Sequence, residues 1–463
     1  MDKVGRKEYL GITIDYNRES KLDKFSLDTL RDRYFWKEET HAQEALARAA
    51  VFAATYKNNT DFELAQRLYD YSSLHWFMFS TPILSNGGTS RGLPISCFLN
   101  YVPDSRVGLS AHYDENIWLA SAGGGIGGYW GDLRSNGVST SNGSKSTGCI
   151  PFMHVVDSQM LAFNQGVTRR GSYAAYLDVS HPEIEEFLNM RKESGGDINR
   201  KCLNLHNGVN ITNDFLKAIK NDEDWRLIDP KTKQPVKTIN ARSLWWQLIN
   251  ARAETGEPYL INIDTCNEHL PKSQKDLGLE IKQSNLCSEI TLATNEERTA
   301  VCCLSSVNLE KFDEWKDNKL FISDLITMLD NVIQHFIENI VDIEELGEYN
   351  ANYKRFTNYI KEEKEGYQKA AFSAYRERSI GLGAMGFHAY LQSKNVPFEG
   401  MEATGINYKL FKHINTRATK ATQDLADMRG SCPDAGSSNV RNVHLIAVAP
   451  NASSSIICGG TSP

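Results

Sequence analysis

The stretch Ser80-Thr81-Pro82 marks a change in the character of this 463-residue sequence. Residues 1–78 have a mostly helical pattern, which includes an amphipathic run over Phe62–Phe79. Beyond Pro82, short apolar runs alternate with helical segments and with loops rich in Gly, Asn and Ser. We therefore predict an N-terminal helical domain over residues 1–78 and one large α/β domain over residues 79–463.

Short apolar runs in the second part are predicted to be strands, with helices between some of them. Strands separated by helices indicate parallel β/α architecture, either closed as a barrel or open. The predicted strands are Ile95–Leu99, Gly208–Ile211, Tyr259–Ile263, Ala300–Leu304 and Leu445–Ala449, and the predicted helices include Ser243–Ala253 and Ile322–Ile343.

The overall charge and hydropathy exclude several classes of protein. The chain has 51 Lys and Arg against 58 Asp and Glu, a net charge of −7, so it lacks the basic field that nucleic acid or an anionic membrane would require. No apolar run approaches the roughly 20 residues that span a bilayer, and the N-terminus does not resemble a signal peptide. We expect neither nucleic acid nor a membrane as a partner.

The cysteine content indicates a reducing compartment. Nine cysteines are scattered along the chain without a C-x-x-C pair and without the density of a disulfide-rich secreted protein. We therefore predict a cytoplasmic location, where a disulfide would be catalytic or redox-linked rather than structural.

The glycine cluster Gly123–Gly128 formally matches the G-x-G-x-x-G pattern of dinucleotide-binding folds. Its context does not fit, because Asp114–Ala122 before it reads as a helix and no acidic residue lies about 20 positions further on. The cluster allows either a close approach of the backbone to a ligand or a packed neighbour, or a tight turn.

The pentad Asn285-Leu286-Cys287-Ser288-Glu289 is the strongest candidate for chemistry. If it is extended, Asn285, Cys287 and Glu289 project from the same face. A thiol between an amide and a carboxylate suits a reacting sulfur beside a proton acceptor. The alternative is a buried cysteine beside a solvated glutamate.

Further cysteines and two polar loops complete the candidates. Cys97 and Cys302-Cys303 lie in or at the end of predicted strands, where they are either within disulfide reach or simply buried thiols. The stretch Pro450–Ser455 suits a phosphate-binding loop, and Gly166–Gly171 places two arginines in a loop suited to an anion. Ordinary surface loops would have similar sequences.

Together these segments resemble the large, catalytic subunit of ribonucleotide reductase, from about Asp28 to the last residue. Several motifs stand in the order and spacing of that family. They are Ser80–Thr89, Ser96-Cys97-Phe98, Asn285–Glu289, Asn308-Leu309 six residues after Cys302, Arg378–Phe387 and Pro450–Pro463.

The resemblance implies roles for five catalytic residues. Cys287 corresponds to the thiyl-radical residue that abstracts the ribose 3′ hydrogen. Glu289 corresponds to the base that takes the 3′-hydroxyl proton, and Asn285 to a residue that hydrogen-bonds the same sugar. Cys97 and Cys302 correspond to the pair that delivers reducing equivalents and ends as a disulfide.

The resemblance also implies binding residues for substrate and effector. The implied substrate contacts are Thr81, Ser96, Gly125, Asn451, Ala452, Ser453, Ser454 and Ser455, the last five in the loop that holds the diphosphate. The implied effector contacts are Asp104, Arg134, Arg169 and Arg170, the last two in a loop that relays effector identity. Arg106 stands where some relatives have a small hydroxyl residue.

The family's fold is a ten-stranded α/β barrel with the radical cysteine on a loop inside it. The implied partners are ribonucleoside diphosphate substrates, a metal-containing small subunit that supplies the radical, and a second large subunit in a homodimer. Nucleoside triphosphate effectors and thioredoxin or glutaredoxin as reductant are also implied, with no metal bound by the chain itself.

The sequence departs from the family at both ends. No ATP-cone domain precedes residue 1, so overall control by dATP at that domain is not expected. The chain stops inside the phosphate-loop motif, so we expect it to be inactive alone and to need a second polypeptide that supplies the rest. Two alternatives are an adenosylcobalamin-dependent reductase and a non-catalytic nucleotide-binding remnant.

Overall fold

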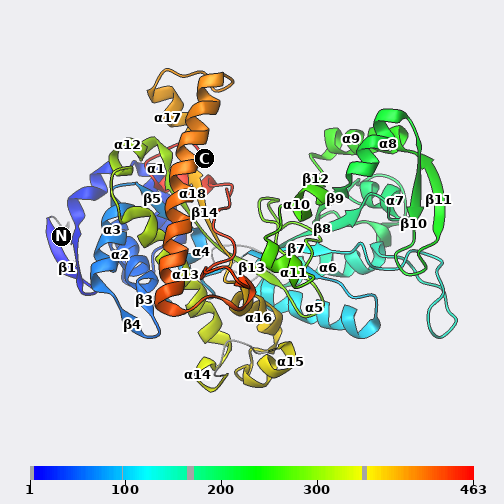
Figure 1. Ribbon diagram of the computed structural model, residues 1–463, viewed down its shortest axis with the longest axis horizontal. Coiled ribbons are helices and arrows are strands. Elements are labelled where there is room, and N and C mark those ends of the chain that lie inside the picture. Colours follow the sequence, from blue (N-terminus) through cyan, green and yellow to red (C-terminus); the bar gives the residue numbers. More distant parts are fainter. Residues whose placement is uncertain (1–4, 96, 164–170, 347–351) are drawn as a thin grey trace. The chain divides into compact units, whose positions relative to one another are not determined.

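The computed structural model describes residues 5–95, 97–163, 171–346 and 352–463 (Figure 1). The chain divides into two compact units. The first comprises residues 1–96, 301–362 and 373–463, and the second comprises residues 97–300 and 363–372. The domain boundary predicted at residue 78 lies inside the first unit. It stays a prediction. Among the described residues, no helix combines the length and apolar content needed to cross a membrane.

Helices dominate the N-terminal part of the first unit. Aspartates begin two of them, because the carboxylates of Asp23 and Asp61 accept hydrogen bonds from the otherwise unpaired amides of Ser26 and Leu64. The elements are β1 (Arg6–Tyr9), β2 (Ile12–Asp15), α1 (Lys24–Arg33), α2 (Ala42–Ala53), β3 (Thr55–Tyr56), β4 (Asn59–Thr60), α3 (Phe62–Ser73) and α4 (Thr81–Asn86).

The rest of the first unit is built on three strands. Strand β13 (Ala300–Asn308) pairs in parallel with β14 (Ile380–Met385) and antiparallel with β5 (Phe77–Phe79). Helix α13 (Phe321–Ile340) packs against α18 (Met401–Arg429). The shorter helices are α12 (Phe312–Trp315), α14 (Ile343–Leu346), α15 (Tyr353–Phe356), α17 (Phe387–Ser393) and α19 (Ala452–Ile457), and α16 (Gln368–Glu377) spans residues of both units.

A buried ionic cluster joins α13 to the end of α18 and to the segments that contain Arg378 and Arg441. The carboxylate of Asp330 on α13 accepts hydrogen bonds from Arg378 Nε at 2.7 Å and Arg429 Nη1 at 2.8 Å, and Arg441 Nε lies 3.4 Å away. Asp330 and Arg441 are fully buried. Burial alone would raise the pKa of Asp330, but the surrounding guanidinium groups outweigh it and hold this pKa well below its ordinary value.

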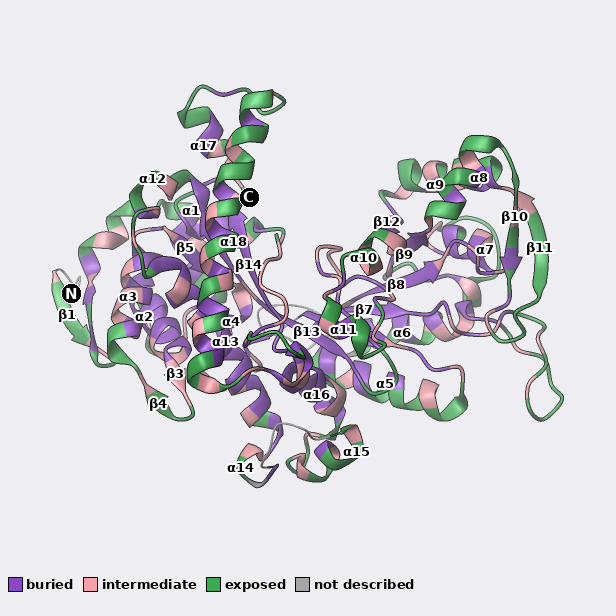
Figure 2. Cartoon of the chain, viewed as in Figure 1, coloured by how far each residue is buried: buried purple, intermediate pink, exposed green. Residues whose placement is uncertain are grey.

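The second unit contains five parallel strands in the order β12-β9-β8-β7-β6. Their bounds are β6 (Cys97–Tyr101), β7 (Gly125–Tyr129), β8 (Ser172–Asp178), β9 (His206–Ile211) and β12 (Tyr259–Asn262). Most residues of β6, β7 and β8 are buried (Figure 2), as expected for parallel strands that are covered on both faces. The predicted parallel β/α architecture is therefore confirmed in this unit.

Helices and one hairpin complete the second unit. The helices are α5 (Arg106–Ser121), α6 (Ile150–Ala162), α7 (Ile184–Asn189), α8 (Asn213–Asn221), α9 (Ala241–Thr255), α10 (Ile263–Glu268) and α11 (Lys272–Asp276). The hairpin consists of β10 (Asp224–Ile228) and β11 (Pro235–Asn240).

The strand predicted at Leu445–Ala449 is wrong. Residues 445–449 form no regular strand. The start of this segment lies beside β14. The Leu382 amide donates to the Leu445 carbonyl at 2.8 Å, and the Ile380 amide donates to the His444 carbonyl at 3.1 Å. This segment therefore accepts hydrogen bonds from two amides on the edge of β14 but does not form a regular β-ladder with it.

Candidate active site

The loop between α11 and β13 carries the candidate pentad. Residues 285–288 form a turn, because the Ser288 amide donates to the Asn285 carbonyl at 3.3 Å and Ser288 adopts a left-handed φ of 68°. The pentad is therefore not extended, so the condition under which Asn285, Cys287 and Glu289 would project from one face of a strand is not met. The loop position implied by the family resemblance agrees with the structure.

The turn brings the amide of Asn285 to the carboxylate of Glu289. Asn285 Nδ2 donates to Glu289 Oε2 at 2.7 Å, while Asn285 Oδ1 accepts from the amides of Glu289 and Ile290 at 3.0 and 3.1 Å. Asn285 is fully buried, whereas Cys287 is half-buried. The side chain of Asn285 thus replaces strand hydrogen bonds as the organiser of this loop.

The glycines of β7 allow the loop to lie directly on the strand. A Cβ atom on Gly127 would come within 2.8 Å of Asn285 Cα, and the Ser284 carbonyl oxygen would be closer still. A Cβ atom on Gly128 would overlap the hydroxyl of Tyr173. Of the two alternatives for the glycine cluster, the close approach of a packed neighbour therefore applies at Gly127 and Gly128. A substrate contact at Gly125 stays a prediction.

Tyr176 on β8 holds the loop from a neighbouring strand. Its hydroxyl donates to the Asn285 carbonyl at 2.6 Å, and its ring belongs to the apolar cluster against which Leu286 packs. Burial is the main reason that the pKa of Tyr176 is raised, so the hydroxyl remains a hydrogen-bond donor. Burial raises the pKa of Tyr259, which also lies beside this cluster, and the nearby groups of Glu257, Cys287 and Glu289 raise it further.

Replacing Tyr176 with Phe should loosen the loop selectively. The lost hydroxyl bond should lower the free energy of unfolding by about 0.5–1.5 kcal/mol and speed hydrogen exchange at the amides of residues 288–290. Tyr173→Phe is the matched control, since this buried tyrosine of the same strand bonds Trp130 Nε1 at 3.0 Å instead. Equal exchange rates at the loop in both variants would contradict the role given to Tyr176.

The two cysteines implied as a redox pair are both buried, one in each unit. Cys97 is the first residue of β6 and lies opposite Gly125 of β7. Cys302 lies on β13, and a Cβ atom on Gly381 of β14 would come within 3.1 Å of its Sγ. Their pairing as a disulfide stays a prediction.

The predicted phosphate loop is in fact a short helix. Residues 452–457 form α19, and the Ser455 amide donates to the Asn451 carbonyl at 2.8 Å. Asn451 is anchored on the sheet of the first unit, because its Oδ1 accepts from Ser306 Oγ at 2.7 Å and its Nδ2 donates to the Ala384 carbonyl at 3.1 Å. Small hydroxyl residues there favoured a loop, but Asn451 provides a helix start.

Two other implied substrate residues are Thr81 and Ser96. Thr81 begins α4 in the first unit, with its Oγ1 3.0 Å from the hydroxyl of Tyr34. Ser96 lies outside the described residues. Substrate binding by Thr81, Ser96 and the 451–455 segment stays a prediction.

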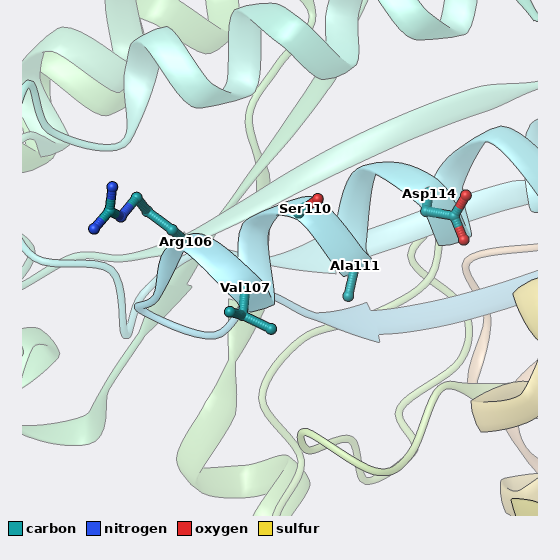
Figure 3. A pocket seen from close by; sticks show the side chains of 5 residues that line it. All are labelled: Arg106, Val107, Ser110, Ala111 and Asp114. Carbon is teal, nitrogen blue, oxygen red and sulfur yellow. The ribbon is translucent and has the colours of Figure 1, made fainter.

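The implied effector residues Asp104 and Arg134 form an ion pair. Arg134 Nε donates to both carboxylate oxygens of Asp104 at 2.9 and 3.0 Å, and this hydrogen bonding raises the pKa of the guanidinium. Arg106 begins α5 close by in sequence and borders an open depression of about 560 Å³ (Figure 3). Arg169 and Arg170 lie outside the described residues.

One cluster of possible metal ligands was not expected from the sequence. Cys149, His181 and Glu183 are all buried, with their ligand atoms within 4.8 Å of one another. Hydrogen bonds already use these groups: His181 Nδ1 accepts from the Glu183 amide, His181 Nε2 donates to the Leu133 carbonyl, and the Glu183 carboxylate accepts from the Cys149 amide. We therefore assign the cluster a structural role.

Comparison with known families matches both parts of the chain. Residues 95–440 match the ribonucleotide reductase barrel domain, and residues 20–92 match the ribonucleotide reductase all-alpha domain. The alpha subunit of a class Id ribonucleotide reductase from Actinobacillus ureae has a similar structure, with a TM-score of 0.79 and 32% identity. That match covers 96% of this chain and 75% of the other.

Viral proteins are similar in sequence. A putative ribonucleoside-diphosphate reductase large subunit of Frog virus 3 is 48% identical over 87% of this chain and 66% of its own length. The ribonucleoside-diphosphate reductase large subunit of Invertebrate iridescent virus 3 is 42% identical over 98% of this chain and 75% of its own length. The chain thus spans about two thirds to three quarters of these relatives. These matches show that the chain belongs to the family of ribonucleotide reductase large subunits, with the barrel and N-terminal all-alpha domains of that family.

Proposed function

We propose that the chain carries out radical-based reduction of ribonucleoside diphosphates to 2′-deoxyribonucleotides for DNA synthesis. The observation that carries this proposal is the turn that bonds the Asn285 amide to the Glu289 carboxylate at 2.7 Å, with the half-buried Cys287 between these two residues in the sequence. An amide donor, a proton acceptor and a sulfur are the groups that such a reaction requires at one sugar.

The roles follow the order of the reaction. A thiyl radical at Cys287 takes the hydrogen atom from the ribose 3′ carbon, and Glu289 takes the 3′-hydroxyl proton. The 2′-hydroxyl then leaves as water. Cys97 and Cys302 supply two electrons and two protons, one proton to the departing water and one to the 2′ carbon, and become a disulfide. Glu289 returns its proton to the 3′ oxygen, and the hydrogen atom returns from Cys287 to the 3′ carbon. Asn285 would hold the sugar while the turn fixes its side chain.

The proposal extends to partners and regulation. A metal-containing small subunit would supply the radical, and thioredoxin or glutaredoxin would reduce the Cys97–Cys302 disulfide in a reducing compartment such as the cytoplasm. Nucleoside triphosphate effectors would bind near Asp104 and Arg134 in a homodimer of large subunits. The segment 451–455 would hold the diphosphate, and Thr81, Ser96 and Gly125 would contact the substrate. The comparisons give no support to an adenosylcobalamin-dependent enzyme.

Reduction of CDP tests the proposal. The chain is mixed with a radical-generating small subunit, a dithiol and a large-subunit fragment covering the part of the relatives that it does not match. We expect dCDP, detected by chromatography and mass spectrometry, in amounts that depend on this chain. Absence of dCDP when the same mixture with an intact related large subunit produces it would contradict the proposal.

Replacing Glu289 with Gln separates proton transfer from loop structure. Gln can still accept the hydrogen bond from Asn285, but it cannot take a proton, so we expect kcat to fall by about 10²–10⁴-fold. The matched control is Glu280→Gln, which removes an exposed carboxylate that pairs with Lys282 at 2.8 Å. The control should keep its kcat. A normal kcat for the Glu289 variant would exclude that residue as the base.

A further inference from the structure

A group of buried polar side chains lies between helix α5 and the loop that carries Cys287. Gln283 lies in this loop two residues before Asn285, Thr299 is its last residue before β13, Glu115 lies on α5, and Asn100 lies on β6. All four belong to the second unit and are buried. Buried polar groups are costly unless they are hydrogen-bonded, so their partners show what they hold in place.

Gln283 attaches the part of the loop just before Asn285 to the sheet. Its Nε2 donates to the Asn100 carbonyl at 2.8 Å and lies 3.3 Å from the Gly127 carbonyl. Its Oε1 accepts from Thr294 Oγ1, further along the loop, at 2.9 Å. One side chain thus joins β6, β7 and two points of the loop.

Glu115 attaches the end of the loop to α5. Its Oε1 accepts from Thr299 Oγ1 at 2.5 Å, and its Oε2 faces Asn100 Nδ2 at 3.4 Å. Asn100 Nδ2 also donates to Asn116 Oδ1 on α5 at 2.9 Å. Helix α5 is therefore joined to the loop directly through Thr299, and indirectly through Asn100 and Gln283.

Packing alone does not explain this group. Apolar side chains of similar volume would fill the space between α5 and the loop without the cost of burying a carboxyl. A connected set of hydrogen bonds instead fixes one position of the loop relative to the helix and the sheet. Because Asn285 and Cys287 follow Gln283 within four residues, the position of the loop sets where the thiol lies.

We propose that Gln283, Glu115 and Thr299 are positioning residues that fix the loop to α5 and thereby hold Cys287 in place for reaction. This proposal rests on the function proposed above in one respect, because it takes Cys287 as the reacting group. A movement of α5 would reach the loop through Thr299 and Gln283.

Substitutions of Thr299 test the proposal. Thr299→Val keeps the shape but removes the hydroxyl that bonds Glu115, whereas Thr299→Ser keeps the hydroxyl. The matched control is Thr422→Val in the first unit, which removes a buried hydroxyl that accepts from the Asn442 amide at 2.9 Å. Each protein is purified as the full chain, and its thermal unfolding is recorded.

The main readout is the rate at which iodoacetamide alkylates Cys287, followed by mass spectrometry of its peptide. Loss of a buried hydrogen bond shifts a local opening equilibrium about five- to tenfold, so we expect alkylation to quicken by that factor in Thr299→Val. Thr299→Ser and Thr422→Val should keep the wild-type rate, even if the latter lowers Tm as much. Hydrogen exchange at the Glu289 and Ile290 amides should change in the same variant only.

Two results would overturn the proposal. One is an unchanged rate of alkylation and exchange in Thr299→Val, and the other is an equal increase in Thr422→Val, which would show a general effect of lost stability. In the CDP assay, Thr299→Val should lower kcat with little change in KM, with rescue by Thr299→Ser. If no variant reduces CDP but the alkylation pattern holds, the proposed function fails while the positioning role stands.

Discussion

Replacing Cys287 with Ser should abolish CDP reduction. Serine is nearly isosteric, but its oxygen holds hydrogen more strongly than sulfur does, so the partner subunit cannot convert it to a radical. The loop should keep its fold, since the hydrogen bonds that organise it run between Asn285, Glu289 and Ile290. We expect the rate to fall by at least about 10⁴-fold, the scale seen when one essential member of a catalytic unit is removed.

Cys266→Ser is the matched control for this variant. Cys266 is another half-buried thiol of the second unit and lies beside the same apolar cluster, which contains Tyr176 and Ile261. Its variant should reduce CDP at nearly the wild-type rate. Product formation by Cys287→Ser above that of a reaction without the chain would show that another group carries the radical.

Replacing Asp330 with Asn should destabilise the first unit severely. The substitution removes the carboxylate shared by Arg378, Arg429 and Arg441 and leaves their positive charges buried together. Breaking a buried ion pair by removing one partner costs about 3–5 kcal/mol. The side-chain NH₂ of Asn would also face at least one guanidinium donor, which adds an unpaired group.

Thermal and urea unfolding would measure this effect. Asp313→Asn is the control, because Asp313 bonds Lys316 and Lys394 at the surface, and its loss should cost no more than about 1 kcal/mol. Since the pKa of Asp330 is lower in the folded chain than in the unfolded one, its stabilisation is fully present above the ordinary carboxyl pKa of 3.8 and is lost as the pH falls below that value. Equal losses in both variants at neutral pH would contradict the role of the cluster.

The main elements could be predicted from the sequence because their signals are local. The apolar runs at 208–211, 259–263 and 300–304 coincide with β9, β12 and β13, and the helix read at 114–122 falls within α5 except for its last residue. The exclusion of a dinucleotide fold depended on that helix. Periodicity and flanking loops are properties of neighbouring residues, so one sequence is sufficient to find them.

Other features depend on contacts between distant residues. The alternation in the pentad would place Asn285, Cys287 and Glu289 on one face of a strand, but Asn285 closes a turn whose stability comes partly from Tyr176, 109 positions earlier. Nothing near Tyr176 marks it in the sequence as part of the candidate site, and the contacts of Gln283 with β6 and β7 could not be derived from its place two residues before Asn285. The segment 445–449 has a strand-like composition, yet its partial pairing with β14 could not be derived from composition.

The glycines of β7 also affect how the protein is made. Gly127 has no side chain to pack, and the groups that cover it, the main-chain atoms of Ser284 and Asn285, come 157 and 158 residues later. At a synthesis rate of about 5–20 residues per second, a ribosome makes this strand roughly 8–30 s before the segment that covers it. During that interval the nascent chain presents a bare glycine backbone, so the strand that supports the reactive loop reaches its final packing only after most of the second unit has been synthesised.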